Sequence, residues 1–85
     1  MSRSRPRRDP QFPSLKAKRL LATLQRQPLN YKVARQKGSH RRLEAPGRPS
    51  FTFAFHDSAT INPSLVRKIL TRDIGLAEDE ARKLL

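Results

Sequence analysis

The first regular pattern along the chain is an apolar face at helical spacing. Apolar residues recur there at i, i+3, i+4 and i+7, which is typical of one face of an amphipathic helix. They are Ala17, Leu20, Leu21 and Leu24. Ser14 precedes them as a plausible N-cap, and Pro28 disfavours helical backbone at the residue before it. The pattern predicts a helix from Ser14 to about Gln27.

A β-hairpin is predicted to follow. Residues 31–37 alternate, with Tyr31 and Val33 on one face and Lys32 on the other. Gly38-Ser39 then has the form of a two-residue turn, because glycine tolerates the positive φ that such turns need. Residues 40–45 are expected to return as the second strand, and residues 46–49 to form a loop.

Residues 51–56, FTFAFH, have the most regular alternation in the chain. The three phenylalanines share one face, and Thr52, Ala54 and His56 share the other. A phenylalanine stripe can stack on RNA bases in some sheets. A core role is the better interpretation here, because a domain this small has few other large apolar residues.

The C-terminal part is predicted to be helical. Asn62 and Pro63 suit the N-cap and first helical positions, and Gly75 is a plausible C-terminal stop. A short last helix is expected over residues 77–85. The apolar face of the first of these two helices consists of Leu65, Val66, Ile69 and Leu70.

These elements predict the α+β class. The order is α-β-β-β-α with a short last helix, and helices cover one face of a three-stranded antiparallel sheet. The opposite face is expected to stay open and polar. Residues 14–85 form the single predicted domain. Residues 1–13 hold four arginines and three prolines, so a disordered basic arm is predicted there.

Composition narrows the classes of function. The 85 residues contain no cysteine, so a disulfide framework, a thiolate nucleophile and a cysteine zinc site are excluded. No apolar run approaches the roughly 18 residues of a membrane span, so we expect a cytoplasmic protein that is not bound to a membrane. The two histidines and their neighbours show no spacing typical of a metal site, and neither a metal nor a cofactor is expected.

The charge is high and uneven. The formal net charge is +12, and residues 14–48 carry ten basic residues against the single acidic residue Glu44. Residues 49–85 carry five basic and five acidic residues. Clustered basic charge of this kind is typical of a polyanion-binding surface, usually for nucleic acid.

His40 follows the glycine-serine turn in RQKGSH, between basic residues. Histidine suits proton transfer near neutral pH, and neighbouring cations stabilise charge that develops on a phosphate. The same position would also suit a polar residue on a wet strand. Alternation places His40 and Arg42 on the open face and Leu43 toward the core, with Arg41 at the edge or with its head group reaching back to solvent.

Three segments, RQKGSH, FTFAFH and NPSLVRKIL, together resemble the HicA (YcfA-like) family of messenger-RNA interferase toxins of type II toxin–antitoxin systems. The resemblance implies a fold similar to the double-stranded-RNA-binding domain and an endoribonuclease that cleaves mRNA. It implies His40 as the catalytic residue and structural roles for Gly38 and Ser39. It also implies a HicB-type antitoxin as partner, for which we expect an acidic surface that covers His40.

The expected RNA contacts are basic residues that would bind phosphates without specifying sequence. They are Arg35, Lys37, Arg41 and Arg42. His56 is open to two interpretations, a second proton-transfer group or a strand-end histidine bonded to a loop carbonyl or to Asp57. The alternative function is a non-catalytic RNA-binding protein, for example one associated with ribosomes. A DNA-binding regulator has less support, because a recognition helix should be rich in Arg, Asn or Gln. The predicted helix over residues 63–73 has only Arg67, Lys68 and Arg72 on its outer side.

Overall fold

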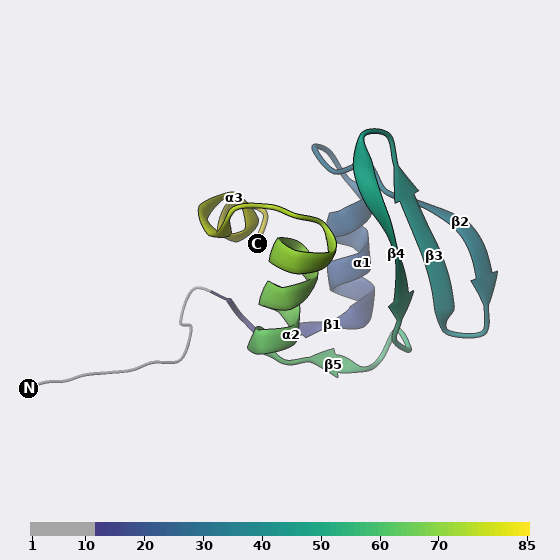
Figure 1. The fold of residues 1–85 in the computed structure, drawn as a ribbon. Helices are drawn as coiled ribbons and strands as arrows, with labels where there is room; N and C mark the ends of the chain where they lie inside the picture. Colours follow the sequence, from purple (N-terminus) through teal and green to yellow (C-terminus); the bar gives the residue numbers. More distant parts are fainter. Residues whose placement is uncertain (1–11) are drawn as a thin grey trace, which may run out of the picture.

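The computed structural model describes residues 12–85 and confirms the predicted α+β architecture (Figure 1). Strands β2, β3 and β4 form an antiparallel sheet in that order, and α1 and α2 lie on one of its faces. A second, two-stranded sheet joins β1 and β5. The elements are β1 (Leu15–Lys16), α1 (Ala17–Gln25), β2 (Lys32–Lys37), β3 (His40–Ala45), β4 (Arg48–Ala54), β5 (Thr60–Ile61), α2 (Pro63–Lys68), the π-helical turn η1 (Ile69–Asp73) and α3 (Glu78–Lys83).

The start of α1 differs from the prediction. Ser14 is not the N-cap, because β1 precedes the helix and pairs antiparallel with β5. The amide of Ala17 donates to the carbonyl of Ala59 at 2.8 Å, and that of Lys18 to the carbonyl of Asp57 at 3.2 Å. Backbone carbonyls of a distant loop therefore accept the hydrogen bonds that amides in the first turn of α1 would otherwise donate to a capping side chain.

The predicted hairpin is confirmed. Lys37 pairs with His40 across Gly38-Ser39, and Gly38 has a φ of +59° at the position where a type II′ turn requires glycine. The next connection is shorter than predicted, since β4 already begins at Arg48. That strand also ends at Ala54, so the prediction that places His56 on its face is wrong.

The core lies between the sheet and the helices. Phe53 and Leu43 have 0% of their surface exposed, and Phe51 has 8%, which confirms the core interpretation of the phenylalanine stripe. Phe55 lies beyond the strand and is half-buried, with its ring edge-on to Phe53. The helices contribute Ala17, Leu20, Leu24, Val66, Ile69 and Leu70.

Phe12 also belongs to this core, with 2% of its surface exposed. It lies within the segment that we predicted to be an arm, so the packed part of the chain begins before Ser14. Its aromatic ring supplies apolar area that the proline- and arginine-rich composition of the segment does not suggest. The rest of the predicted arm, residues 1–11, lies outside the described residues.

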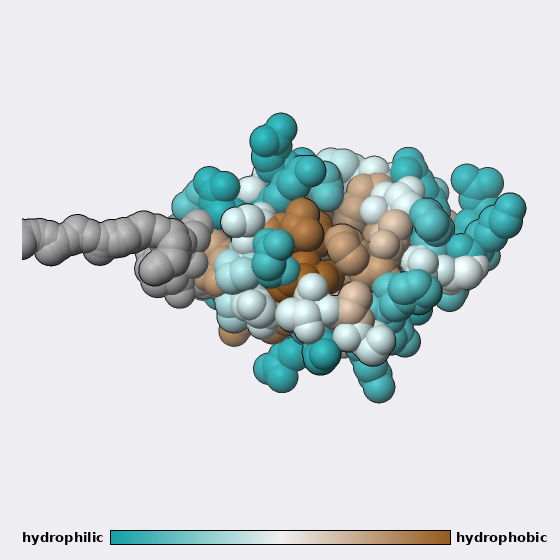
Figure 2. Space-filling view, turned by 90° about the horizontal axis from the view of Figure 1, so that it is seen from below, coloured by the Kyte–Doolittle hydropathy of each residue, from teal (hydrophilic) through white to brown (hydrophobic). Residues whose placement is uncertain are grey.

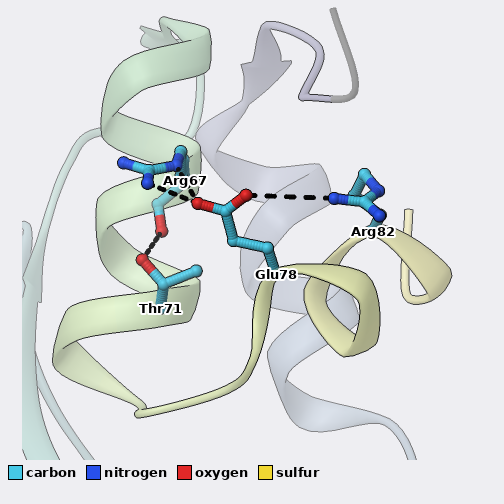
Figure 3. A network of polar contacts seen from close by, with 4 residues as sticks. All are labelled: Arg67, Thr71, Glu78 and Arg82. Carbon is cyan, nitrogen blue, oxygen red and sulfur yellow. Dashed lines mark hydrogen bonds and ion pairs between the residues drawn. The ribbon is translucent and has the colours of Figure 1, made fainter. Parts of the chain in front are cut away.

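The C-terminal helices form as predicted. Asn62 caps α2 by accepting a hydrogen bond from the amide of Leu65 at 2.9 Å, and Gly75 has a φ of +92°. Between them, α2 passes into the π-helical turn η1, which was not predicted. Glu78, at the start of α3, is bound by Arg67 of α2 and lies 4.0 Å from Arg82 (Figure 3). None of the helices in residues 12–85 has the length and apolar character needed to cross a membrane.

Tyr31 gives the fold a testable dependence on pH. Its hydroxyl donates to the carbonyl of Pro49 at 2.8 Å, and its ring packs edge-on against Phe51. Burial raises the pKa of Tyr31 above its ordinary value, although the charge of Arg48 partly opposes this. The folded state therefore holds the phenolic proton more tightly than the unfolded state, which adds stability below about pH 10 that is lost as the pH rises further.

We expect the urea midpoint of the wild type to fall more steeply between about pH 9 and pH 11 than that of Tyr31→Phe. The phenylalanine variant keeps the ring but lacks the ionisable group, so other titrating residues affect both proteins alike. Parallel decreases in the two midpoints would show that Tyr31 makes no such contribution.

Candidate nucleic-acid interface and active site

His40 lies on the sheet face that is turned away from the helices. In the β3–β4 ladder it pairs with Ala54, and Arg42 pairs with Thr52. The intervening Arg41 and the buried Leu43 point to the opposite face. His40 is exposed, as alternation predicts. The open face therefore presents an imidazole and a guanidinium side by side on one strand.

A β-bulge at Ala34 adds two further cations to this face. Val33 pairs with Leu43 on the core side, whereas Arg35 pairs with Arg42, so one extra residue is accommodated between them. Strict alternation would have placed Arg35 and Lys37 on the same face as Val33. Because the bulge shifts the alternation by one residue, both side chains join His40 on the open face instead.

These residues line a shallow depression of about 580 Å³, which we call the basic depression. Its lining residues are Arg35, Gln36, Lys37, His40, Arg42 and Thr52. Three of them are cationic and none carries a carboxylate, so the depression favours an anion such as a phosphate. In Figure 2, which shows the molecule from below, hydrophilic side chains surround a hydrophobic area in the middle of the view and also gather at its right-hand end.

The turn fixes the position of His40 within the basic depression. Gly38 and Ser39 bring Lys37 and His40 opposite each other as the last pair of the hairpin. The side chain of Gln36 donates to the carbonyl of Gly38 at 3.1 Å and ties the turn to the strand before it. The imidazole is thus held at the start of β3, next to the two-residue turn and opposite Lys37.

Arg41 lies elsewhere, although it was predicted to bind RNA together with the other three cations. Its Nη2 lies 2.9 Å from Oδ1 of Asp57, and only 14% of its side chain is exposed. Its Nη1 donates to the carbonyl of Phe55 at 3.5 Å. Since the carbonyl of Asp57 accepts the amide of Lys18, Arg41 links the hairpin to the first turn of α1.

His56 lies in a second shallow depression, of about 470 Å³, which we call the turn-side depression. It does not line the basic depression. Its side chain makes no hydrogen bond within residues 12–85. The bond to Asp57 or to a loop carbonyl, which one of the two interpretations requires, is therefore not formed there. The depression is lined by Gly38, Ser39, Arg41, His56, Asp57 and Ser58. Among the described residues, no three histidine or carboxylate side chains come together as a possible metal site.

Because Arg41 and Arg42 lie on different faces of the sheet, alanine substitution should affect folding stability at Arg41 and RNA binding at Arg42. Arg41→Ala removes hydrogen bonds to a carboxylate and a carbonyl, so we expect it to lower the free energy of unfolding by about 1–3 kcal/mol. Arg42→Ala should leave the fold nearly unchanged but removes a cation from the open face. The slope of log affinity for single-stranded RNA against log salt concentration should therefore fall in magnitude by about 0.7.

Urea unfolding and fluorescence anisotropy at several salt concentrations measure the two effects. Each variant serves as the control for the other, because both lose one arginine from the same strand. A weakened salt dependence in Arg41→Ala equal to that in Arg42→Ala would contradict the assigned positions.

Comparison with known proteins gives one match. The family model described as the HicA toxin of bacterial toxin-antitoxin systems matches residues 17–76, which is more than half of the chain. The matched segment runs from the first residue of α1 to just beyond η1 and contains both depressions. No curated protein and no solved structure matches the chain.

Proposed function

The chain belongs to the HicA toxin family of bacterial toxin–antitoxin systems, and on this basis we propose that it is a metal-independent endoribonuclease that cleaves messenger RNA. Membership implies a toxin role, an RNA target and an antitoxin partner. We assign His40 as the general acid or base, and Arg35, Lys37 and Arg42 as the phosphate contacts. Cleavage of mRNA would take place in the cytoplasm.

The observation that supports this most is the exposed imidazole of His40 within the basic depression. RNA carries its own nucleophile, the 2′-hydroxyl. When His40 accepts the 2′-proton, the 2′-oxygen attacks the adjacent phosphorus, and the bond from phosphorus to the 5′-oxygen breaks. The products are a 2′,3′-cyclic phosphate and a 5′-hydroxyl, whose proton is supplied by a general acid or by water.

The cations stabilise the charge of this reaction. Negative charge grows on the phosphate oxygens as the 2′-oxygen attacks, so cations held in place beforehand lower the barrier. Arg35 and Arg42 face each other across the β2–β3 ladder, and Lys37 faces His40. A phosphate beside His40 therefore has positive groups from two strands around it.

The partner is proposed to be a HicB-type antitoxin. The basic depression contributes no acidic group, so a protein that covers it should present carboxylates there. Such a partner would exclude RNA from His40 and neutralise the cations at the same time. A complex that leaves His40 open to solvent would contradict this mode of inhibition.

Induced expression in a bacterial host tests the function. We expect the wild type to arrest growth and to shorten messenger RNAs, while His40→Ala at equal protein level does neither. Co-expression of the HicB-type antitoxin should restore growth. If His40→Ala shortens messenger RNAs as strongly as the wild type, the catalytic assignment fails. If it arrests growth without shortening them, toxicity comes from RNA binding without cleavage, and the proposed mode of toxicity fails.

A further inference from the structure

We propose that the turn-side depression binds one nucleobase of the RNA, next to the phosphate held in the basic depression. The inference rests on the proposed function, since it concerns the same RNA strand. It assigns His56, Asp57 and Ser58 to base recognition rather than to proton transfer. The ligand is a base of single-stranded RNA, because a base within a duplex is stacked and its edge is paired.

The two depressions lie on either side of the same turn. Lys37 and His40, which flank the turn, line the basic depression, whereas Gly38 and Ser39 line the turn-side depression. A Cβ added at Gly38 would meet no atom within 4 Å, so open space surrounds the turn at this residue. An RNA strand that crosses the turn thus passes from one depression directly into the other.

The charges of the two depressions differ. The basic depression contains three cations and no carboxylate. In the turn-side depression, the single cation Arg41 is already paired with Asp57 at 2.9 Å. A phosphate is therefore favoured in the first depression, and an uncharged polar group in the second. The uncharged polar groups of an RNA chain are its bases and ribose hydroxyls, and of these only the bases have a flat aromatic ring.

The side chains of the turn-side depression suit a base. His56 and Ser58 are exposed, and neither side chain makes a hydrogen bond within residues 12–85. An imidazole offers a flat ring for stacking, as aromatic side chains do in single-strand binding. The carboxylate of Asp57 is 56% exposed beside Arg41 and can accept a hydrogen bond from a base amino group. Together they provide a stacking surface and hydrogen-bonding groups for a base edge.

Binding of abasic RNA to a cleavage-deficient protein tests the proposal. The probe is an eight-nucleotide single-stranded RNA in which one abasic nucleotide is moved through each position. With His40→Ala protein, we expect one position at which loss of the base weakens binding by about 5- to 150-fold. In the double variant His40→Ala/His56→Ala, binding of the intact RNA is weaker, and that position no longer stands out.

Two controls separate base recognition from other effects. His40→Ala/Gln25→Ala changes an exposed neutral residue at the end of α1 and should keep the sensitive position. The salt dependence of binding should be the same with and without His56, because a base contact releases no counterion. A weaker salt dependence without His56 would identify a phosphate site and overturn the proposal.

The remaining outcomes are also decisive. If the sensitive position persists without His56, the base lies elsewhere and the proposal fails, even when the wild type cleaves RNA. If His56→Ala slows cleavage of saturating RNA without changing affinity, His56 acts in proton transfer and the proposal fails. If the wild type does not cleave RNA but base sensitivity depends on His56, the proposed ribonuclease activity fails and the base site stands.

Discussion

Replacing His40 by alanine is expected to lower the rate of RNA cleavage by about 10²–10⁴-fold, the usual contribution of general acid–base catalysis. The affinity for RNA should hardly change, because Arg35, Lys37 and Arg42 remain in the basic depression and supply the phosphate contacts. Single-turnover cleavage of a long single-stranded RNA at saturating protein gives the rate. Fluorescence anisotropy with a short RNA gives the affinity.

The exposure of His40 makes this substitution easy to interpret. Removal of an exposed side chain leaves no cavity, so the thermal unfolding midpoint should stay within about 2–4 °C of the wild type, corresponding to about 0.5 kcal/mol. A variant that cleaves at the wild-type rate would show that His40 is not catalytic. A loss of affinity as large as the loss of rate would make His40 a binding residue instead.

The second large effect is expected from removing the three open-face cations together. Arg35→Ala/Lys37→Ala/Arg42→Ala should weaken RNA binding by about 100-fold or more at low salt, since a hydrogen bond to a charged group contributes about 1.5–3 kcal/mol before screening by solvent. The log–log salt slope should fall in magnitude by about 2, which corresponds to about 0.7 for each phosphate contact to a single strand.

A second triple variant provides the matched control. Lys68→Ala/Arg72→Ala/Lys83→Ala removes the same net charge from exposed positions on α2, η1 and α3. If the cations act through contacts in the basic depression, this variant should retain most of the affinity. Equal losses in the two triple variants would mean that RNA responds to the total charge of the molecule and not to the open face.

The hairpin and its exposed histidine could be predicted because their signals are local. A glycine-serine pair between two alternating segments specifies the turn, and the turn determines which residues of β3 face the core. The phenylalanine stripe is recognisable for the same reason, since a strand has a period of two. These features give the position of His40 and Arg42 without any knowledge of distant contacts.

The parts that were missed depend on contacts between distant residues. The bulge at Ala34 has no clear signal in the sequence, so alternation alone would put Arg35 and Lys37 on the wrong face. The partner of Arg41 is Asp57, sixteen positions away, and Arg41 does not line the basic depression with the other three cations. The sequence around Arg41, between His40 and Arg42, contains nothing that identifies Asp57 as its partner.

The N-terminal end shows the same limit. Leu15–Lys16 lies within the predicted helix, yet the two residues pair with Thr60–Ile61. A two-residue strand is too short to show alternation, so only the tertiary pairing identifies it. Phe12 likewise follows a basic, proline-rich segment and still belongs to the core.

The most direct measurement is analysis of the products formed when the purified protein cleaves a long single-stranded RNA in excess EDTA. Attack by the 2′-hydroxyl with His40 as the proton-transfer group predicts cleavage without metal, with 5′-hydroxyl and 2′,3′-cyclic phosphate ends and no such products from His40→Ala. Cleavage that stops in EDTA, or products with 5′-phosphate and 3′-hydroxyl ends, would contradict the mechanism, because a water molecule would then be the nucleophile.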